Sequence, residues 1–348
     1  MNTRPWLATY AENAIPAEIN ADAFPSVVHM LEAAMQRFAD RPAFHSFGQQ
    51  LTYADVDRLS AAFAAWLQHS LGVQPGDRVA VMLPNLMAFP IACLGILRAG
   101  AVQVNVNPMY TPRELEHQLK DSGSSTIVIF NGVTPTLAEI VGNTGIKTVI
   151  SVAPGDGTSA ALPSPPVDPR LVGSISFAQA LTAGALLERK PIQLKGSDLI
   201  FLQYTGGTTG LSKGAALSHR NLVANTEQFK AMMPDALRPG QEVVVTAIPL
   251  YHIFALMVNF ITYFSVGADN WLEANPRDMD GFVQTLQQSK VTVFTGVNTL
   301  FAGLVMHPKI REVDFSHLRL TGGGGAAVVG ATSAKWKEIT GQFIREGY

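Results

Sequence analysis

Short apolar runs alternate with longer amphipathic stretches along this chain, and this alternation limits the fold more than any other feature. Residues 78–85 (RVAVMLPN) and 101–107 (AVQVNVN) are predicted strands on either side of a helical run, and two further strands are predicted at 125–130 (STIVIF) and 147–152 (KTVISV). A repeated strand–helix order favours parallel pairing with helices on both faces. The sequence therefore predicts an α/β fold with two mainly parallel sheets flanked by helices.

One of the intervening helices carries its own start and stop signals. Thr111 is predicted as the N-cap of a helix over residues 112–122, with Pro112 at the first position and Glu114 closing a capping box. Gly123 is suited to end this helix because glycine adopts the left-handed conformation at little cost. Local chemistry alone therefore bounds this helix.

The α/β pattern is interrupted once and then resumes. Residues 153–170 are rich in Pro, Gly and Ser, and they predict a long surface loop that leads to a second unit. We predict a first α/β subdomain over residues 1–190 and a second over 191–348. The strands predicted in the second unit lie at 197–205, 214–219, 242–249, 290–297 and 318–325.

Helices are predicted between these later strands. Asn275 and Pro276 are expected as the cap and first residue of one of them, and His219 and Arg220 as the start and solvated face of another. Residues 253–268 (IFALMVNFITYFSVGA) form the longest apolar stretch, but they are too few to span a bilayer and are interrupted by Asn259 and Thr262. A buried helix is the expectation for them, and peripheral contact with a membrane surface stays open.

Composition excludes several classes of protein. The 348 residues are 47% hydrophobic and 15% charged, which is typical of a globular chain. Lys and Arg number 25 against 27 Asp and Glu, and no basic run offers an electrostatic footprint for nucleic acid. Cys93 is the single cysteine, so no internal disulfide can form, and a cytoplasmic location without a secretory signal is expected.

A glycine-rich stretch marks the first candidate site. Residues 204–214 (YTGGTTGLSKG) combine backbone N–H groups free to turn toward an anion with hydroxyl donors and the positive charge of Lys213, which together suit phosphate binding. The Walker A spacing fails, because Lys213 follows Ser212 and precedes Gly214. The alternative is a solvated glycine-rich hairpin between two strands.

Two further features have both a functional and a structural interpretation. Residues 321–327 (TGGGGAA) formally match the dinucleotide-binding pattern at Gly322, Gly324 and Ala327, but we expect Glu346 in IREGY to lack the flanks of a complete βαβ unit. A tight strand-to-helix turn explains the glycines equally well. His252 in PLYHIFAL is either a core histidine or a site residue.

The stretch YTGGTTGLSKGAALSHRNL resembles the phosphate loop of the adenylate-forming enzymes, which include acyl-CoA synthetases, luciferases and peptide-synthetase adenylation domains. The stretches GDRVAVMLPN, TPRELEHQLKDSG, PLYHIFAL, NPRD, TGVNTLF and GQFIREGY resemble that family in the same order. The likeness covers nearly the whole chain, and it is strongest to bacterial long-chain fatty acid–CoA ligases.

The resemblance implies a two-step ligase reaction that uses ATP with Mg²⁺ and takes CoA as co-substrate. A fatty carboxylate attacks the α-phosphate to give an acyl-adenylate and diphosphate, and the CoA thiol then displaces AMP. Its partners would be a long-chain fatty acid, ATP and CoA, with no nucleic acid. It further implies an incomplete large N-terminal domain without the small C-terminal domain, and little activity for this chain alone.

The same resemblance assigns roles to individual residues. Thr205 would reach the Mg²⁺, Lys213 would neutralise the departing diphosphate, and His252 would lie beside the reacting carboxylate. The residues implied in nucleotide binding are Tyr204, Thr205, Gly206, Gly207, Thr208, Thr209, Gly210, Lys213, Gly323, Gly324, Gly325 and Tyr348. Two alternatives stay open: a nucleotide- or acyl-binding protein without catalysis, and an NAD-dependent oxidoreductase based on the pattern at Gly322.

Overall fold

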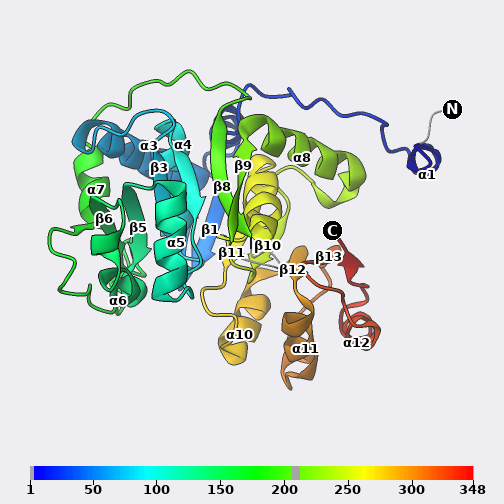
Figure 1. Cartoon of the computed structure of the whole chain (residues 1–348). Helices are drawn as coiled ribbons and strands as arrows, with labels where there is room; N and C mark the ends of the chain where they lie inside the picture. Colours follow the sequence, from blue (N-terminus) through cyan, green and yellow to red (C-terminus); the bar gives the residue numbers. More distant parts are fainter. Residues whose placement is uncertain (1–3, 206–211, 348) are drawn as a thin grey trace.

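The computed structural model describes residues 4–205 and 212–347, and within these ranges the strands form two seven-stranded sheets (Figure 1). The first sheet has the order β7-β6-β5-β3-β4-β8-β9, and all of its strands are parallel except β9, which pairs antiparallel with β8. Its strands are β3 (Arg78–Met82), β4 (Val102–Asn105), β5 (Thr126–Phe130), β6 (Thr148–Val152), β7 (Ile175–Ser176), β8 (Leu199–Thr205) and β9 (Lys213–Ser218).

The second sheet has the order β14-β13-β12-β10-β11-β1-β2, and only the β1–β2 pair is antiparallel. The two sheets confirm the predicted α/β class, although β1, β2, β7, β11 and β14 were not predicted. The strands of this sheet are β1 (Pro42–Ser46), β2 (Gln49–Thr52), β10 (Val243–Thr246), β11 (Asp269–Leu272), β12 (Val293–Gly296), β13 (Leu320–Gly323) and β14 (Arg345–Glu346).

The two sheets exchange strands across residue 190. β1 and β2 precede that residue but belong to the second sheet, whereas β8 and β9 follow it but belong to the first. Strand pairing joins parts of the chain that are far apart in sequence, and a local pattern does not reveal it. The division into subdomains 1–190 and 191–348 stays a prediction, and the sheets do not follow it.

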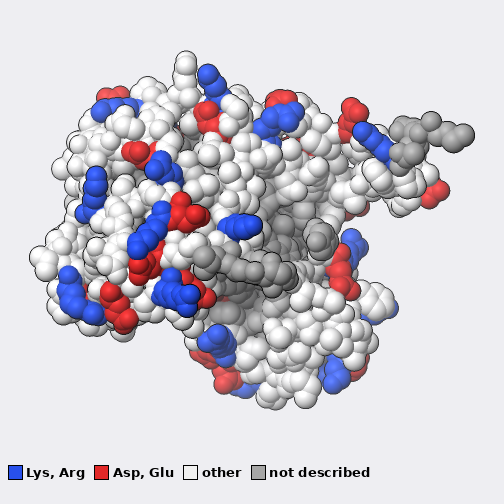
Figure 2. All heavy atoms as spheres, viewed as in Figure 1, with Lys and Arg blue, Asp and Glu red and all other residues white. Residues whose placement is uncertain are grey.

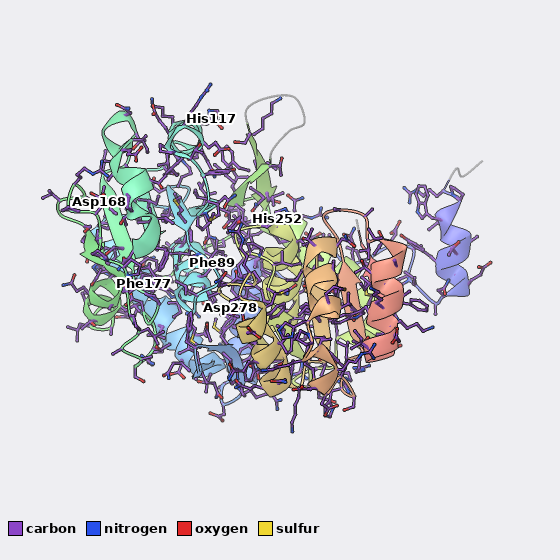
Figure 3. The ribbon with its side chains drawn as sticks, turned by 90° about the horizontal axis from the view of Figure 1, so that it is seen from below. Phe89, His117, Asp168, Phe177, His252 and Asp278 are labelled. Carbon is purple, nitrogen blue, oxygen red and sulfur yellow. The ribbon has the colours of Figure 1, made fainter. Side chains whose placement is uncertain are left out.

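Alternate residues of a strand face opposite sides of a sheet, so each sheet can pack against helices on both faces. The helices and the two sheets therefore form five stacked layers. In β3, Ala80 and Met82 pack with α5 and α6, whereas Val79 and Val81 pack in the central cluster with α2, α3, α4 and η4. The central cluster also contains β1, so it joins the two sheets, and α10, α11 and α12 cover the outer face of the second. Phe89 and Phe177 belong to this central core (Figure 3).

Most of the helices lie in a central layer between the two sheets and in two outer layers. The central layer contains α2 (Val27–Arg37), α3 (Tyr53–Ser70), α4 (Ala88–Arg98) and the π-helical segment η4 (Ala255–Thr262), and the outer layers contain α5 (Pro112–Ser122), α6 (Thr134–Ala138), α10 (Met279–Ser289), α11 (Asn298–Met306) and α12 (Gly330–Thr340). The others are α1 (Trp6–Glu12), α7 (Phe177–Gly184), α8 (His219–Met232) and α9 (Tyr263–Ser265). Figure 1 shows α1 apart from the body of the molecule, and none of its residues is buried.

Capping chemistry confirms one predicted helix and corrects another. Thr111 and Glu114 form the predicted capping box of α5, and Gly123 ends it at φ 63°. Asn275 and Pro276 do not start a helix: α10 begins at Met279, because the carboxylate of Asp278 accepts the N–H of Gly281 and serves as the cap.

The apolar stretch 253–268 forms the predicted buried helix, as η4 followed by α9. The side chain of Asn259 is completely buried and bonds to Thr246 and Thr295, so this polar interruption ties η4 to the second sheet. No helix of the described residues has the length and apolar character needed to cross a bilayer.

His219 confirms the predicted helix start and is itself buried. It begins α8 as predicted, but only 2% of its surface is exposed, and its Nδ1 accepts the N–H of Val27 at the start of α2. Burial lowers its pKa to about 4. Arg220 is exposed as expected and pairs with Asp22.

Candidate active site

The glycine-rich stretch is enclosed by two antiparallel strands. Thr205 ends β8 and lies directly opposite Lys213, the first residue of β9. The hairpin therefore brings a hydroxyl and an ammonium group to the same end of the strand pair, and we call this end, formed by Thr205 and Lys213, the hairpin mouth. Both residues are exposed. A strand follows the loop where a Walker A site requires a helix, which agrees with the failed spacing. Gly206, Gly207, Thr208, Thr209 and Gly210 lie outside the described residues.

Tyr204 supports the hairpin from within the protein. Its hydroxyl donates to Oδ2 of Asp121 on α5 at 2.6 Å, and its ring lies under Gly214, where a Cβ atom would come within 2.9 Å of it. Burial and the adjacent Asp121 carboxylate raise the pKa of Tyr204. The side chain predicted to bind nucleotide therefore faces α5.

Helix α5 holds the second stem of the hairpin as well. Nε2 of His117 lies 3.1 Å from the carbonyl oxygen of Ser212, and because a carbonyl only accepts, this nitrogen carries the hydrogen. The hairpin that ends at Thr205 and Lys213 is thus anchored on one helix, and His117 is seen near it in Figure 3.

His252 lies on the segment between β10 and η4. It is exposed, and its Nδ1 accepts the N–H of Phe254 at 3.3 Å. The protein packed against the ring lowers its pKa, so the neutral form is favoured at pH 7. With Nδ1 acting as an acceptor, Nε2 carries the hydrogen and can donate to a ligand.

The second glycine cluster packs against this segment. A Cβ atom at Gly324 would lie 3.0 Å from the ring of Phe254, and one at Gly323 would lie 2.6 Å from Val328. Gly325 has φ +77°, in the left-handed region. Internal packing and backbone conformation therefore require glycine at these positions whether or not a nucleotide binds there. Tyr348 lies outside the described residues.

The dinucleotide-binding pattern is not supported in this cluster. Helix α12 begins at Gly330, several residues beyond the glycines, so the pattern does not open a helix as a Rossmann turn must. The expectation that Glu346 lacks a flanking strand is wrong, because β14 pairs parallel with β13 and completes a βαβ unit. The carboxylate of Glu346 accepts the N–H of Val328 and is occupied within the protein.

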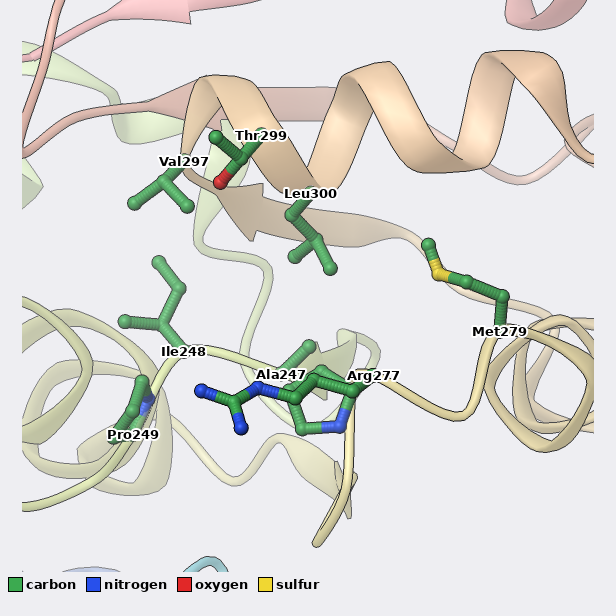
Figure 4. A pocket seen from close by; sticks show the side chains of 9 residues that line it. Ala247, Ile248, Pro249, Arg277, Met279, Val297, Thr299 and Leu300 are labelled. Carbon is green, nitrogen blue, oxygen red and sulfur yellow. The ribbon is translucent and has the colours of Figure 1, made fainter. Parts of the chain in front are cut away.

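A pocket of about 420 Å³ opens at the carboxyl ends of β10 and β12 (Figure 4). The connection from β10 runs over the inner face of the sheet through η4, and the connection from β12 over the outer face through α11. Such a reversal creates a crevice in which α/β proteins bind ligands. The pocket was not predicted, and its lining is mainly apolar with one guanidinium: Ala247, Ile248, Pro249, Pro276, Arg277, Met279, Val297, Thr299 and Leu300.

Charges around these features are mixed. On the face seen in Figure 2, Lys and Arg side chains stand beside Asp and Glu. The ion pairs of the described residues include Arg170–Asp168 and Lys120–Glu116. Among residues 4–205 and 212–347, no group of three His, Cys, Asp or Glu side chains could hold a metal ion by itself. An anion would meet positive charge locally, from Lys213 or Arg277.

Comparison with known proteins covers nearly the whole chain. It is 46% identical to a long-chain fatty acid–CoA ligase of Salmonella typhimurium over 99% of its length. The chain spans 63% of the length of this curated relative. Among solved structures, an anthranilate CoA ligase in complex with anthranoyl-AMP superposes with a TM-score of 0.81 at 22% identity, covering 95% of this chain and 62% of that one.

A long-chain fatty acid–CoA ligase from Archaeoglobus fulgidus has the same fold, with a TM-score of 0.75 at 21% identity, covering 95% of this chain and 63% of that one. The family model of the AMP-binding enzymes matches residues 31–348. With two stacked α/β sheets, the glycine-rich hairpin and this match over most of its length, the chain belongs to the AMP-binding enzyme family.

Proposed function

We propose that this chain is the nucleotide-binding portion of a long-chain fatty acid–CoA ligase. The reaction joins a fatty acid and CoA at the expense of ATP, through an acyl-adenylate, and releases AMP and diphosphate. The observation that carries the proposal is the 46% identity to such ligases over 99% of the chain. A cytoplasmic location, with peripheral contact at the inner face of the cell membrane, belongs to this proposal, because ATP and CoA are cytoplasmic and long-chain fatty acids partition into membranes.

The hairpin mouth is proposed as the phosphate site. Lys213 would hold the β- and γ-phosphates, and Thr205 would contribute its hydroxyl to the Mg²⁺ that accompanies ATP. Exposure of both side chains at facing strand ends fits this, since Mg²⁺ in nucleotide sites takes few protein ligands and keeps phosphate and water oxygens. The bound Mg²⁺ would supply positive charge against the triphosphate. Gly206, Gly207, Thr208, Thr209 and Gly210 are proposed to surround the same phosphates.

The glycine cluster is proposed as the adenine site. Gly323, Gly324 and Gly325 present backbone without side chains, and a flat base can approach such a surface closely. Tyr348 is proposed to pack on the same ring. The exposed Gly325 supports this proposal, whereas packing against Val328 and Phe254 accounts for Gly323 and Gly324.

The pocket between β10 and β12 is proposed to take the acyl substrate. Apolar walls suit a hydrocarbon chain, and Arg277 at the pocket offers a positive charge. His252 lies three residues beyond Pro249 of the same wall, and its Nε2–H can donate to the carboxylate oxygen as the adenylate forms. CoA is proposed to deliver its thiol to this carbonyl in the second step.

The proposed phosphate site is tested by equilibrium binding of Mg-ATP to this chain. Loss of one charge-assisted contact costs about 1.4 kcal/mol, so Lys213→Gln is expected to weaken binding about tenfold. Lys309→Gln, which removes an exposed lysine far from the hairpin, is the matched control and leaves the affinity unchanged. Equal affinity in wild type and Lys213→Gln contradicts the role of Lys213.

Exchange of labelled diphosphate into ATP, dependent on a fatty acid, tests for the chemical step. Exchange by this chain supports the ligase reaction, and Mg-ATP binding without any exchange favours the alternative of binding without catalysis. Binding of NAD(H) in place of ATP contradicts the proposed function altogether.

A further inference from the structure

The segment from Thr246 to His252 connects β10 to η4, and it forms one wall of the pocket between β10 and β12. Ala247, Ile248 and Pro249 supply that wall, and His252 follows at its end. The carbonyl oxygen of Thr246 still accepts the N–H of Glu273, and that of Pro249 accepts the N–H of His252. The segment then leaves the sheet, yet Ala247, Ile248 and Leu250 are buried. Buried peptide groups require hydrogen bonds, so the shape of this wall depends on what satisfies them.

One side chain from the other sheet bonds to three backbone groups of this segment. Nδ2 of Asn85 donates to the carbonyl oxygens of Thr246 at 3.1 Å and Ile248 at 3.0 Å, and its Oδ1 accepts the N–H of Leu250 at 2.8 Å. Asn85 lies in the turn between β3 and α4 of the first sheet, and it is 4% exposed. Only a carboxamide donates twice and accepts once in this geometry.

A second carboxamide fixes the end of the same segment. Nε2 of Gln203, on β8, donates to the carbonyl oxygen of Tyr251 at 3.0 Å. The orientation of Gln203 is itself fixed, because its Oε1 accepts from Asn105 at 2.9 Å and Asn105 accepts from Gln103 at 2.7 Å. These three amides are buried across β4 and β8.

The position of these amides argues for more than general stability. Asn85 and Gln203 together make four bonds to the short segment that lines the pocket and carries His252. Gln203 also directly precedes Tyr204 in the stem of the glycine-rich hairpin. The hairpin and the pocket wall belong to different sheets. Among the described residues, Gln203 is therefore a hydrogen-bonded connection between the two proposed subsites, and Asn85 ties the same pocket wall to the first sheet.

We propose that Asn85 and Gln203 are positioning residues for the acyl substrate. From the first sheet they hold residues 246–252 in the shape that forms the pocket wall and presents His252. This inference rests on the proposed function of the pocket. Neither residue touches the substrate, so each acts through the backbone that it holds.

The test compares two ligands on the chain as it stands. Calorimetry gives the dissociation constants of AMP and of palmitoyl-sulfamoyl-adenosine, a stable mimic of the acyl-adenylate. Asn85→Ala is expected to weaken binding of the acyl mimic at least tenfold while changing AMP affinity less than threefold. Gln203→Met keeps the side-chain volume but loses the donated bond, and it is expected to weaken binding of the acyl mimic more than binding of AMP. This variant replaces Asn85→Ala as the test if Asn85→Ala fails to fold.

Gln68 provides a matched control for a buried amide that holds backbone elsewhere. It is 5% exposed, and it bonds to both the carbonyl oxygen and the N–H of Lys190. Gln68→Ala is expected to lower the melting temperature without moving the ratio of the two affinities, which separates positioning from stability.

The outcomes are distinct. If wild type binds both ligands and the variants weaken them equally or not at all, Asn85 and Gln203 are merely structural and the inference is overturned. If wild type binds neither ligand, the proposed function itself fails, and the inference fails with it.

Discussion

Two histidines illustrate how the surroundings of a single residue decide what its imidazole does. His219 is buried, and its Nδ1 accepts the N–H that begins α2. His252 is exposed, and its Nδ1 accepts from Phe254, which leaves Nε2–H free to reach a ligand. No sequence pattern distinguishes the two histidines, because both stand next to polar and apolar neighbours alike. Burial makes the first a structural cap and exposure makes the second a candidate donor.

At the scale of single residues, His219 predicts a loss of stability in mild acid. Burial lowers its pKa to about 4 in the folded protein, whereas an unfolded histidine titrates near 6.5. The unfolded state therefore binds more protons between these values, and the free energy of unfolding falls as pH drops from 6.5 to 4, by about 3 kcal/mol in all. Urea denaturation at several pH values measures this slope.

A second histidine provides the control for that slope. His219→Gln removes the titrating group and is expected to flatten the dependence between pH 6.5 and 4. His317→Gln removes an exposed histidine and leaves the dependence as in wild type. An unchanged slope in His219→Gln would show that other groups cause the acid sensitivity.

At the scale of elements, capping residues predict a helix start correctly when the cap and its partner both lie in the first turn of that helix. The capping box at Thr111 and Glu114 located α5 correctly, because each partner lies within one turn of the other. The pair Asn275–Pro276 misplaced α10, because Asp278 supplies a charged acceptor three residues later and the helix starts there. Where several cap residues follow one another, sequence alone does not choose between them.

The start of α10 gives a prediction at this scale. Asp278→Ala removes the acceptor for the N–H of Gly281 and is expected to lower the free energy of unfolding by about 1 kcal/mol. Asn275→Ala, at the position predicted from sequence, is the paired control and is expected to cost much less. Chemical denaturation of the two variants measures the difference, and an equal or larger loss in Asn275→Ala would contradict this assignment of the cap.

At the scale of the whole molecule, the α/β class and most central strands could be predicted from their apolar runs. The exchange of β1, β2, β8 and β9 between the sheets could not, because pairing such as that of Phe44 with Asn270 spans long stretches of chain. The same limit applies to the candidate site. The hairpin residues Thr205 and Lys213 stand close in sequence, whereas Asn85 meets Leu250 only in the folded structure.

The pocket between β10 and β12 was also not predicted, although the order of strands in the sheet indicates its position. It forms where connections leave neighbouring strands over opposite faces, and this depends on the order of strands in the sheet. Apolar residues after each strand, such as Ile248 and Val297, look like core in the sequence. Strand order turns them into the walls of a binding site.

The proposed acyl-adenylate site is tested most directly by calorimetric titration of this chain with palmitoyl-sulfamoyl-adenosine, alongside octanoyl-sulfamoyl-adenosine and NADH. We expect one molecule of the palmitoyl compound to bind per chain, more tightly than the octanoyl compound, with no heat from NADH. Absence of saturable binding by the acyl compounds, or binding of NADH in their place, would contradict the assignment of this chain to fatty acid activation.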